Sequence, residues 1–355
     1  MQSQNQSVKA NRQAGGRQVR EEARQHRKSE SMFNWKLPGA ISLLHVATYF
    51  LVGSLFLTLT RHIPESRRTT LDFFQFYQPF SVGTLFTQAV RGLVIGLVCL
   101  PLFQTIRSSR RPWLLLTGVL WGIGVFGSVE PLPGSFEGLL YTITTPLEHG
   151  IALFASLVQF LLLSIMLFSL LPGTEQTSPE TNEREKFGLM ENKRYLRAFT
   201  LFHVATYFVV GAIFYNAFSV YQDAMETMEL FQYWRPLENM VMPLAIFFGQ
   251  FIRGLILALL FQPFYTVFFH QRQGWIALFT TIWGMTFLSA VSIAPWILQE
   301  MIPGYAPVSE LLVGMPEVTV QMLLFSLLIY VWQRRRTTGE GFQTGRSGTP
   351  SAVHS

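Results

Sequence analysis

LLHVATYFLVG at residues 43–53 recurs almost unchanged as LFHVATYFVVG at residues 201–211. Both copies lie within long apolar runs, and the similarity continues along most of the two halves of the chain. Repetition of a long stretch indicates that one structural unit is present twice. The sequence therefore predicts an internal duplication, in which each buried polar residue of one half can be compared with its counterpart.

The two halves align without a gap over most of their length. From Gln88 onward the spacing is constant at 162 residues, the separation of residues 88 and 250. Before that point it is 157 or 158, as between residues 79 and 236 or 45 and 203, so the second half carries a short insertion near 237–242. The matched pairs include Gln88 with Gln250, Arg91 with Arg253, Gly92 with Gly254, Trp121 with Trp283, Gly122 with Gly284, Gln159 with Gln321 and Ser164 with Ser326.

The composition indicates a membrane protein. Of 355 residues, 49% are hydrophobic and 14% are charged, and an apolar run of about 20 residues has the length that spans a bilayer. We expect eight transmembrane helices, at roughly 39–60, 83–104, 113–129, 149–171, 198–218, 242–266, 275–297 and 311–332. A soluble protein's helices would carry a charged stripe, which these runs mostly lack. The predicted fold is all-α, with two tandem four-helix repeats.

Five segments follow from the apolar runs and the polar stretches between them. They are a basic tail at 1–36, a first membrane repeat at 37–171, a charged linker at 172–197, a second membrane repeat at 198–332 and a polar tail at 333–355. The composition of both tails is typical of disorder, and the linker is predicted to be a flexible tether. Four spans per repeat predict parallel copies, related by an axis along the membrane normal.

Lysine and arginine predict the orientation, because cytoplasmic loops carry an excess of both. With the N-terminus inside, 21 of the 27 lie on the cytoplasmic side, four lie outside, and Arg91 and Arg253 lie within spans. No apolar segment follows directly on a short basic one, so we expect no cleaved signal peptide and a first span that is retained. The prediction is a plasma-membrane or inner-membrane protein with both termini in the cytoplasm.

The net charge of +6 follows from this topology and from the basic tail, so it does not indicate nucleic-acid binding. The tail residues Arg17, Arg20, Arg24, Arg27 and Lys28 fall at helical spacing, which suits anionic lipid headgroups. A solvated, disordered tail is the alternative. The single cysteine excludes an internal disulfide and a multi-cysteine metal site.

Two similar aromatic segments precede the second and sixth spans. They are DFFQFYQP at 72–79 and ELFQYWRP at 229–236. Aromatic side chains favour the headgroup level, where an apolar ring and a polar edge are both accommodated. We expect short interfacial helices there, which either anchor the chain in the interface or form a lid over an outer vestibule.

Arg91 and Arg253 are the strongest functional candidates. A charge near the bilayer centre costs several kcal/mol and is kept when it is paired or lines a polar cavity. Each arginine follows a glutamine, Gln88 or Gln250, by one helical turn, and Arg91 lies about 12 Å inside its helix. On the fourth helix of each repeat, Gln159 or Gln321 falls at a similar depth. Each repeat is therefore predicted to build one polar layer from its second and fourth helices.

The two layers differ in one carboxylate. Glu317 lies near the depth of Arg253, whereas its counterpart in the first half is Ala155. If Glu317 neutralises Arg253, then Arg91 has only amides and carbonyls, which points to a bound anionic group, because a guanidinium suits such a group well. The predicted ligand-binding residues are Arg91, Arg253, Gln88, Gln250, Gln159, Gln321 and Glu317. The alternative is structural: each arginine caps carbonyls or reaches the headgroups with its long stem.

His45 and His203 form a second candidate site, with Tyr49 and Tyr207 one turn later on the same faces. A pseudo-twofold axis could bring the histidines together as axial ligands of a haem or as a proton relay. The alternative, an interhelical hydrogen bond in each repeat, is the more usual role of a single histidine in a span. No cofactor or metal is predicted.

The motifs of common enzymes are missing, including His-Glu-x-x-His, Gly-x-Ser-x-Gly and the phosphate-binding loop. The leading hypothesis is binding or passage of a small anionic or polar solute at the interface between the repeats. A non-catalytic membrane scaffold or regulator is the second hypothesis, and a redox or lipid-modifying membrane enzyme is the third.

Overall fold

The computed structural model of the chain describes residues 36–74, 77–128, 131–171, 189–219, 223, 232–236, 241–289 and 309–344. Within these ranges the regular structure is helical, apart from one isolated β-bridge, so the predicted all-α class is confirmed for them. The predicted N-terminal tail up to residue 35, the linker from 172 to 188 and the last residues of the C-terminal tail lie outside the described residues.

Six helices among the described residues are long and apolar enough to cross a membrane, which agrees with a multi-pass membrane protein. They are the N-terminal helix (Lys36–Thr60), α3 (Val82–Arg107), α6 (Pro146–Leu170), α7 (Leu189–Ala217), α9 (Val241–Phe261, continued by η3 at Gln262–Phe264 and α10 at Tyr265–Phe269) and α13 (Ser309–Thr344). Each contains one of the predicted apolar runs.

The other two predicted spans correspond to shorter helices. α4 (Pro112–Phe126) has 15 residues and is therefore about 22 Å long, less than the roughly 30 Å of a hydrocarbon core. α11 (Gly274–Ser289) has 16 residues, and the rest of the run predicted at 275–297 lies outside the described residues. Six of the eight expected spans therefore correspond to described helices that are long enough to cross a membrane.

Two helices extend beyond the predicted apolar runs. α7 begins at Leu189, within the segment predicted to be a linker. α13 continues to Thr344, within the segment predicted to be a disordered tail. Charged and polar residues can continue a helix as long as proline and glycine do not end it, so a change in composition does not mark a helix boundary.

Of the residues that the structure describes in the two aromatic segments, 72–74 and 232–233 are helical. In the first, α2 spans Thr69–Phe74, residues 75–76 lie outside the described part of the chain, and Tyr77 lies in a loop. In the second, the described residues 232–236 contain a β-bridge from Trp234 to Thr142. The backbone of Arg235 donates to the Tyr141 carbonyl at 2.7 Å. The second segment is therefore paired with the chain that follows α5 (Phe136–Tyr141), a short helix in the loop between α4 and α6.

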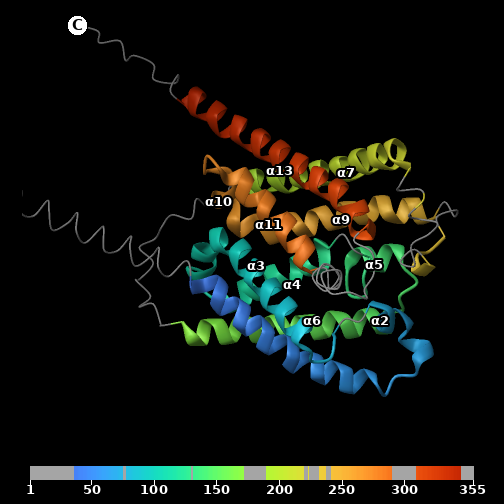
Figure 1. The fold of residues 1–355 in the computed structure, drawn as a ribbon. Helices are drawn as coiled ribbons and strands as arrows, with labels where there is room; N and C mark the ends of the chain where they lie inside the picture. Colours follow the sequence, from blue (N-terminus) through green and yellow to red (C-terminus); the bar gives the residue numbers. More distant parts are fainter. Residues whose placement is uncertain are drawn as a thin grey trace, which may run out of the picture.

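The helices are arranged in layers (Figure 1). α7 and α13 pack together on one side of the molecule, while the N-terminal helix, α2 and α6 lie on the other. Between them, α4 packs against α9 and α11, and α3 packs against α11. The central layer thus joins helices of the two predicted repeats, and α5 lies beside it at one end.

Glycines permit close contact across this central layer in a reciprocal way. A Cβ atom on Gly122 of α4 would lie 2.8 Å from Leu260 of α9, and one on Gly284 of α11 would lie 2.5 Å from Val98 of α3. By the spacing of 162 residues, Gly122 matches Gly284 and Val98 matches Leu260. The same contact is therefore made twice, with the partners exchanged, as in a contact between two copies related by a twofold axis.

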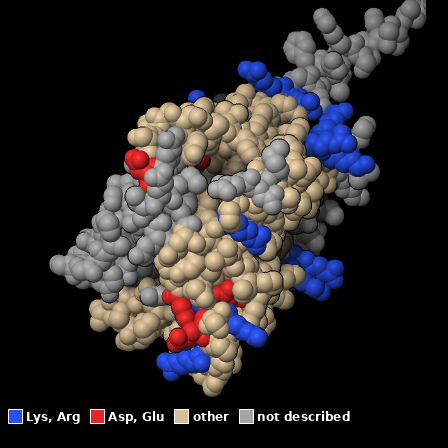
Figure 2. Space-filling model, turned by 90° about the vertical axis from the view of Figure 1, so that its right-hand side faces the viewer, with Lys and Arg blue, Asp and Glu red and all other residues tan. Residues whose placement is uncertain are grey.

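Charged residues gather at the ends of the helices. Figure 2 shows the end at the right of Figure 1, where basic and acidic groups lie side by side near the lower edge of the view. In η1 (Glu65–Arg67), α2 and the residue between them, Arg68 pairs with Glu65 at 3.7 Å and with Asp72 at 3.3 Å. The opposite ends of the long helices and their connections carry mainly basic residues, namely Lys36, Arg107, Lys193, Arg194, Arg272 and Arg336.

Candidate functional site

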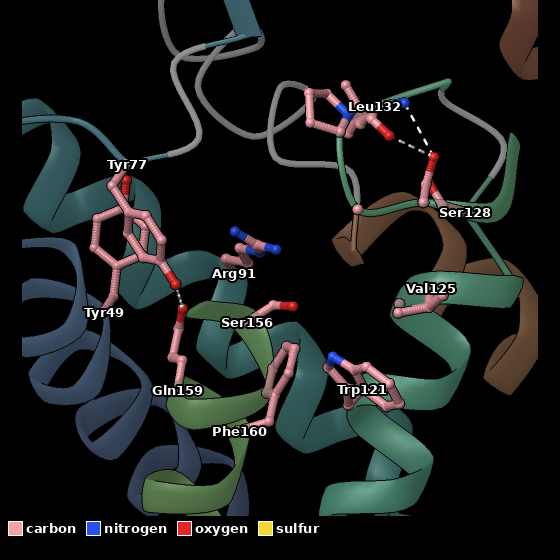
Figure 3. A pocket seen from close by; sticks show the side chains of 14 residues that line it. Tyr49, Tyr77, Arg91, Trp121, Val125, Ser128, Leu132, Ser156, Gln159 and Phe160 are labelled. Carbon is pink, nitrogen blue, oxygen red and sulfur yellow. Dashed lines mark hydrogen bonds between the residues drawn. The ribbon is translucent and has the colours of Figure 1, made fainter. Parts of the chain in front are cut away.

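Arg91 lines a cavity of about 40 Å³ within the first half of the chain. Its walls come from the N-terminal helix, the loop before α3, α3 itself, α4, the loop after α4, and α6. Figure 3 shows the Arg91 side chain between the rings of Tyr49 and Tyr77 on one side and the loop of Ser128 and Leu132 on the other, with Ser156 and Gln159 of α6 beneath it. Such a volume holds about three water molecules.

The predicted polar layer of the first half is therefore present, because Arg91 of α3 and Gln159 of α6 share this cavity. Tyr77 adds a contact that the sequence did not indicate. Its hydroxyl donates to Oε1 of Gln159 at 2.8 Å, and the Tyr49 hydroxyl accepts from the backbone nitrogen of Gln78 at 2.9 Å. The loop before α3 is thus attached to both neighbouring helices.

A chain of hydrogen bonds continues from Tyr77 into the protein. Oε1 of Gln159 accepts from Tyr77. The Nε2 group of the same amide therefore faces His45 and donates to the Nδ1 atom of its ring at 3.4 Å. The ring proton of His45 is then on Nε2, which donates to Oε1 of Gln88 at 3.1 Å. Burial raises the pKa of Tyr77, so its hydroxyl remains a donor. All hydrogen bonds in this series therefore donate in the same direction, from Tyr77 toward the amide of Gln88, where the series ends.

The loop after α4 forms the opposite wall through a tight turn. Gly134 has φ of 82°, a left-handed conformation that glycine adopts without strain. Its backbone nitrogen donates to Nδ1 of His149 at 2.9 Å, and the Ser135 side chain accepts from the backbone of Leu132 and Gly138. His149 was not singled out by the sequence, and it holds this wall in place from α6.

Arg253 donates to Oε1 of Gln250 in its own half at 3.3 Å, and its other described contacts are with the first half of the chain. Its guanidinium forms an ion pair with Glu137 of α5, and both side chains are almost fully buried. The same guanidinium donates to the carbonyls of Phe126 at 2.5 Å and Ser128 at 2.9 Å. Carbonyls at the end of a helix have no partner within it, so Arg253 caps the end of α4.

The structure shows a carboxylate partner of Arg253 that the sequence did not indicate. We expected Glu317 to neutralise Arg253, whereas the ion pair that the structure forms is with Glu137. Glu317 lies half-buried on α13, where its carboxylate approaches Gly211 of α7. Glu137 belongs to a Gly- and Pro-rich loop, and no periodic pattern indicates which helix such a loop will contact.

Arg253 also lines a second cavity, of about 30 Å³, together with His203 and Gln321. The other walls are mainly apolar, from Phe199, Leu257, Ile282, Met322 and Phe325. We expected both arginines to face one cavity between the repeats. The described cavities instead each contain one of them, and the two are separated by the adjacent residues Gly127 and Ser128.

The histidines make the same interhelical contact in both halves. Nε2 of His203 donates to Oε1 of Gln250 at 3.3 Å, which repeats the contact of His45 with Gln88. Both ring nitrogens of His45 are hydrogen-bonded, so axial ligation of a haem would require one of these bonds to break. Tyr207 contacts the hydroxyl of Tyr141 at 2.5 Å, which ties α7 to α5.

No family model, curated protein or solved structure matches the chain. The geometry around the two arginines is therefore the basis for a function. Gln88 and Gln250 each accept from a histidine, Arg253 and Glu137 join the two halves, and Arg91 lines a cavity with polar and apolar walls.

Proposed function

We propose that the protein is a multi-pass membrane protein that binds a small anionic group in the cavity lined by Arg91. The supporting observation is the cavity that Arg91 lines within the first half of the chain, whose walls also include the polar side chains of Tyr49, Ser156 and Gln159.

The walls of this cavity suit an anion. A guanidinium presents planar donors that match a carboxylate or a phosphate, and hydrogen bonds between charged groups are stronger than neutral ones. Arg91 is 6% exposed, so water screens its charge only weakly. The hydroxyl of Tyr49 and the amide of Gln159 are held by the contacts described above, so the site is ordered before a ligand enters.

The experiment compares Arg91→Gln with the wild-type protein in detergent. Isothermal titration with the sodium salts of chloride, acetate and phosphate measures binding, and the melting temperature reports the fold. We expect at least one anion to bind the wild type and to lose about tenfold or more in affinity in Arg91→Gln, the effect of removing one charge-assisted interaction. The fold should persist.

Arg272→Gln is the matched control, because this arginine is exposed at the other end of the helices. It should leave anion binding unchanged. Absence of binding by any anion to the folded wild type would contradict the proposed function and would favour a scaffold that recruits a partner. Misfolding of Arg91→Gln would be resolved with Arg91→Lys, which keeps the charge and should retain part of the affinity.

We further infer that the two halves are tandem parallel repeats with both termini in the cytoplasm. The reciprocal contacts of Gly122 and Gly284 support a twofold relation, and so do the equal contacts of His45 and His203. The basic ends of the long helices support the orientation. In this arrangement the Arg91 cavity lies toward the outer side, below the loop that carries Tyr77.

A further inference from the structure

The loop between α4 and α6 is attached to α6 by His149. Nδ1 of His149 accepts from the backbone N–H of Gly134 at 2.9 Å. The two segments are closely packed there, because a Cβ on Gly134 would lie 2.9 Å from Cβ of Ala152, which follows one turn later on α6. His149 is 5% exposed and Ala152 is fully buried, so water has little access to this contact.

The residues around Gly134 form one compact turn. The side chain of Ser135, the N-cap of α5, accepts from the backbone of Leu132 at 3.0 Å and from that of Gly138 at 2.8 Å. Gly138 lies directly against Leu132, since a Cβ on Gly138 would lie 2.0 Å from the Leu132 carbonyl oxygen. We call residues 132–138 the 132–138 turn, and its parts are expected to move together.

The 132–138 turn takes part in both polar regions of the molecule. Its first residues line the cavity of Arg91, and Figure 3 shows Leu132 on the side of this cavity that lies opposite the two tyrosines. The turn also carries Glu137, which pairs with Arg253 of the second half. The hydrogen bond to the histidine therefore holds a segment that forms a cavity wall and joins the two halves.

Only the neutral form of His149 can make this contact. Because the backbone N–H of Gly134 is a donor, Nδ1 must present its lone pair, and the ring proton is then on Nε2. A protonated imidazole carries hydrogen on both nitrogens and has no acceptor. Protonation would place two N–H groups against each other in a buried contact, so the turn would have to move away from α6.

Two groups of opposite charge act on His149. Glu148 precedes it on α6, and Arg235 belongs to the segment that pairs with the chain after α5. The Glu148 carboxylate accepts from the hydroxyls of Thr70 and Thr145, and the Arg235 guanidinium donates to a backbone carbonyl. Because both groups have partners of their own, their positions do not depend on the protonation of the ring.

We infer that His149 is a pH-sensitive switch: its neutral ring holds the 132–138 turn against α6, and its protonation between about pH 8 and pH 5 releases the turn and opens the Arg91 cavity. His149 is the fourth residue of α6, so it lies about 5 Å from the end of the helix, close to the aqueous phase. The inference goes beyond the proposed function, because it holds for whatever the cavity contains.

Hydrogen exchange in detergent measures the release of the turn. Peptides that cover residues 131–139 are compared between the wild type and His149→Gln, which can accept from Gly134 at every pH and has no titrating group. Comparison of the two proteins at one pH removes the intrinsic effect of pH on exchange. We expect similar exchange at about pH 8, and about tenfold faster exchange in the wild type at about pH 5. Peptides of α7 should show no such difference.

His149→Leu tests the hydrogen bond itself, because it removes the acceptor without adding a charge. The turn should then exchange severalfold faster than in the wild type already at about pH 8. If His149→Gln does not fold, His149→Asn supplies the same acceptor on a shorter side chain. The inference would be overturned by wild-type protection in His149→Leu, by no acceleration of the wild type in acid, or by an equal acceleration in the glutamine variant, which would make Glu148 or general loosening the cause.

A thiol in the cavity tests whether release of the turn opens it. Ser156 lines the cavity of Arg91 from α6, and Ser156→Cys in a Cys99→Ala background places a thiol there. Its rate of reaction with a small thiosulfonate is divided by that of the exposed variant Ser66→Cys. From about pH 8 to pH 5 this ratio should rise about tenfold, and it should stay constant when His149→Gln is added. A ratio that does not rise without His149→Gln would overturn the opening of the cavity.

Discussion

At the scale of single residues, the two arginines that match in sequence each line a cavity, Arg91 with Tyr77 and Gln159 and Arg253 with His203 and Gln321. Arg253 also joins the halves, because its guanidinium contacts Glu137 and the end of α4. The sequence predicted that both would be buried and that each would share a layer with a glutamine. It did not predict Glu137, because the path of a loop depends on tertiary contacts and not on periodicity.

The buried ion pair predicts a large effect on stability. Glu137→Gln or Arg253→Gln should each lower the free energy of unfolding by about 3–5 kcal/mol, because each leaves a buried charge without its partner. The double variant should lose less than the sum of the two. Denaturant unfolding in detergent measures these values. Additive losses would show that the two side chains are not energetically coupled.

The hydroxyl of Tyr77 should contribute to ligand affinity without contacting the ligand. Tyr77→Phe removes the donor to Gln159, which begins the chain that orients His45 and Gln88. We expect a loss of about 1 kcal/mol of stability and about fivefold weaker anion binding. Titration of the folded variant with acetate measures the second effect. Unchanged affinity would mean that the orientation of the amides does not depend on this loop.

At the scale of elements, the apolar runs predicted where helices form, because backbone groups in hydrocarbon must be paired within the segment. The predicted second and fourth spans, 83–104 and 149–171, lie within a few residues of α3 and α6. Helix ends that lie in polar stretches of the sequence were harder to predict. α6 begins with a capping box between Thr145 and Glu148, and Glu148 also accepts from Thr70, so this acid is buried in the protein.

Close helix packing at glycine predicts a contrast between two substitutions. A Cβ on Gly96 of α3 would lie 2.4 Å from Cα of Pro38, so Gly96→Ala forces the backbones apart and should cost about 1–3 kcal/mol. Gly118→Ala on α4 meets no atom within 4 Å and should stabilise the protein by up to about 1 kcal/mol. Melting temperatures of the two variants test this. Equal effects would contradict the packing of α3 on the N-terminal helix.

At the scale of the whole molecule, the proposed tandem repeats account for the central layer, in which α3 and α4 of one half pack against α9 and α11 of the other. The sequence predicted two matched polar layers, and the structure shows each arginine with its own glutamine in a separate cavity. The sequence also predicted that both arginines share one cavity, and this prediction was wrong. The segment from Phe126 to Ser128 lies between the two polar layers, where Arg253 caps the end of α4. A comparison of the two halves of the sequence cannot predict this capping contact.

The proposed orientation is tested by labelling single cysteines in intact and permeabilised cells. In a Cys99→Ala background, Ser108→Cys and Ser66→Cys place thiols at exposed positions at opposite ends of the helices. An impermeant maleimide should label Ser66→Cys from outside intact cells and Ser108→Cys after permeabilisation. The reverse pattern would contradict cytoplasmic termini.

The most direct test of the central claim is a diffraction experiment on protein soaked with bromoacetate, in which bromine marks the ligand by anomalous scattering. The account predicts a bromine peak in the cavity of Tyr49, Tyr77 and Gln159, with the carboxylate on Arg91, and its loss in Arg91→Gln. A map of the soaked wild type with bromine only at the surface would contradict it.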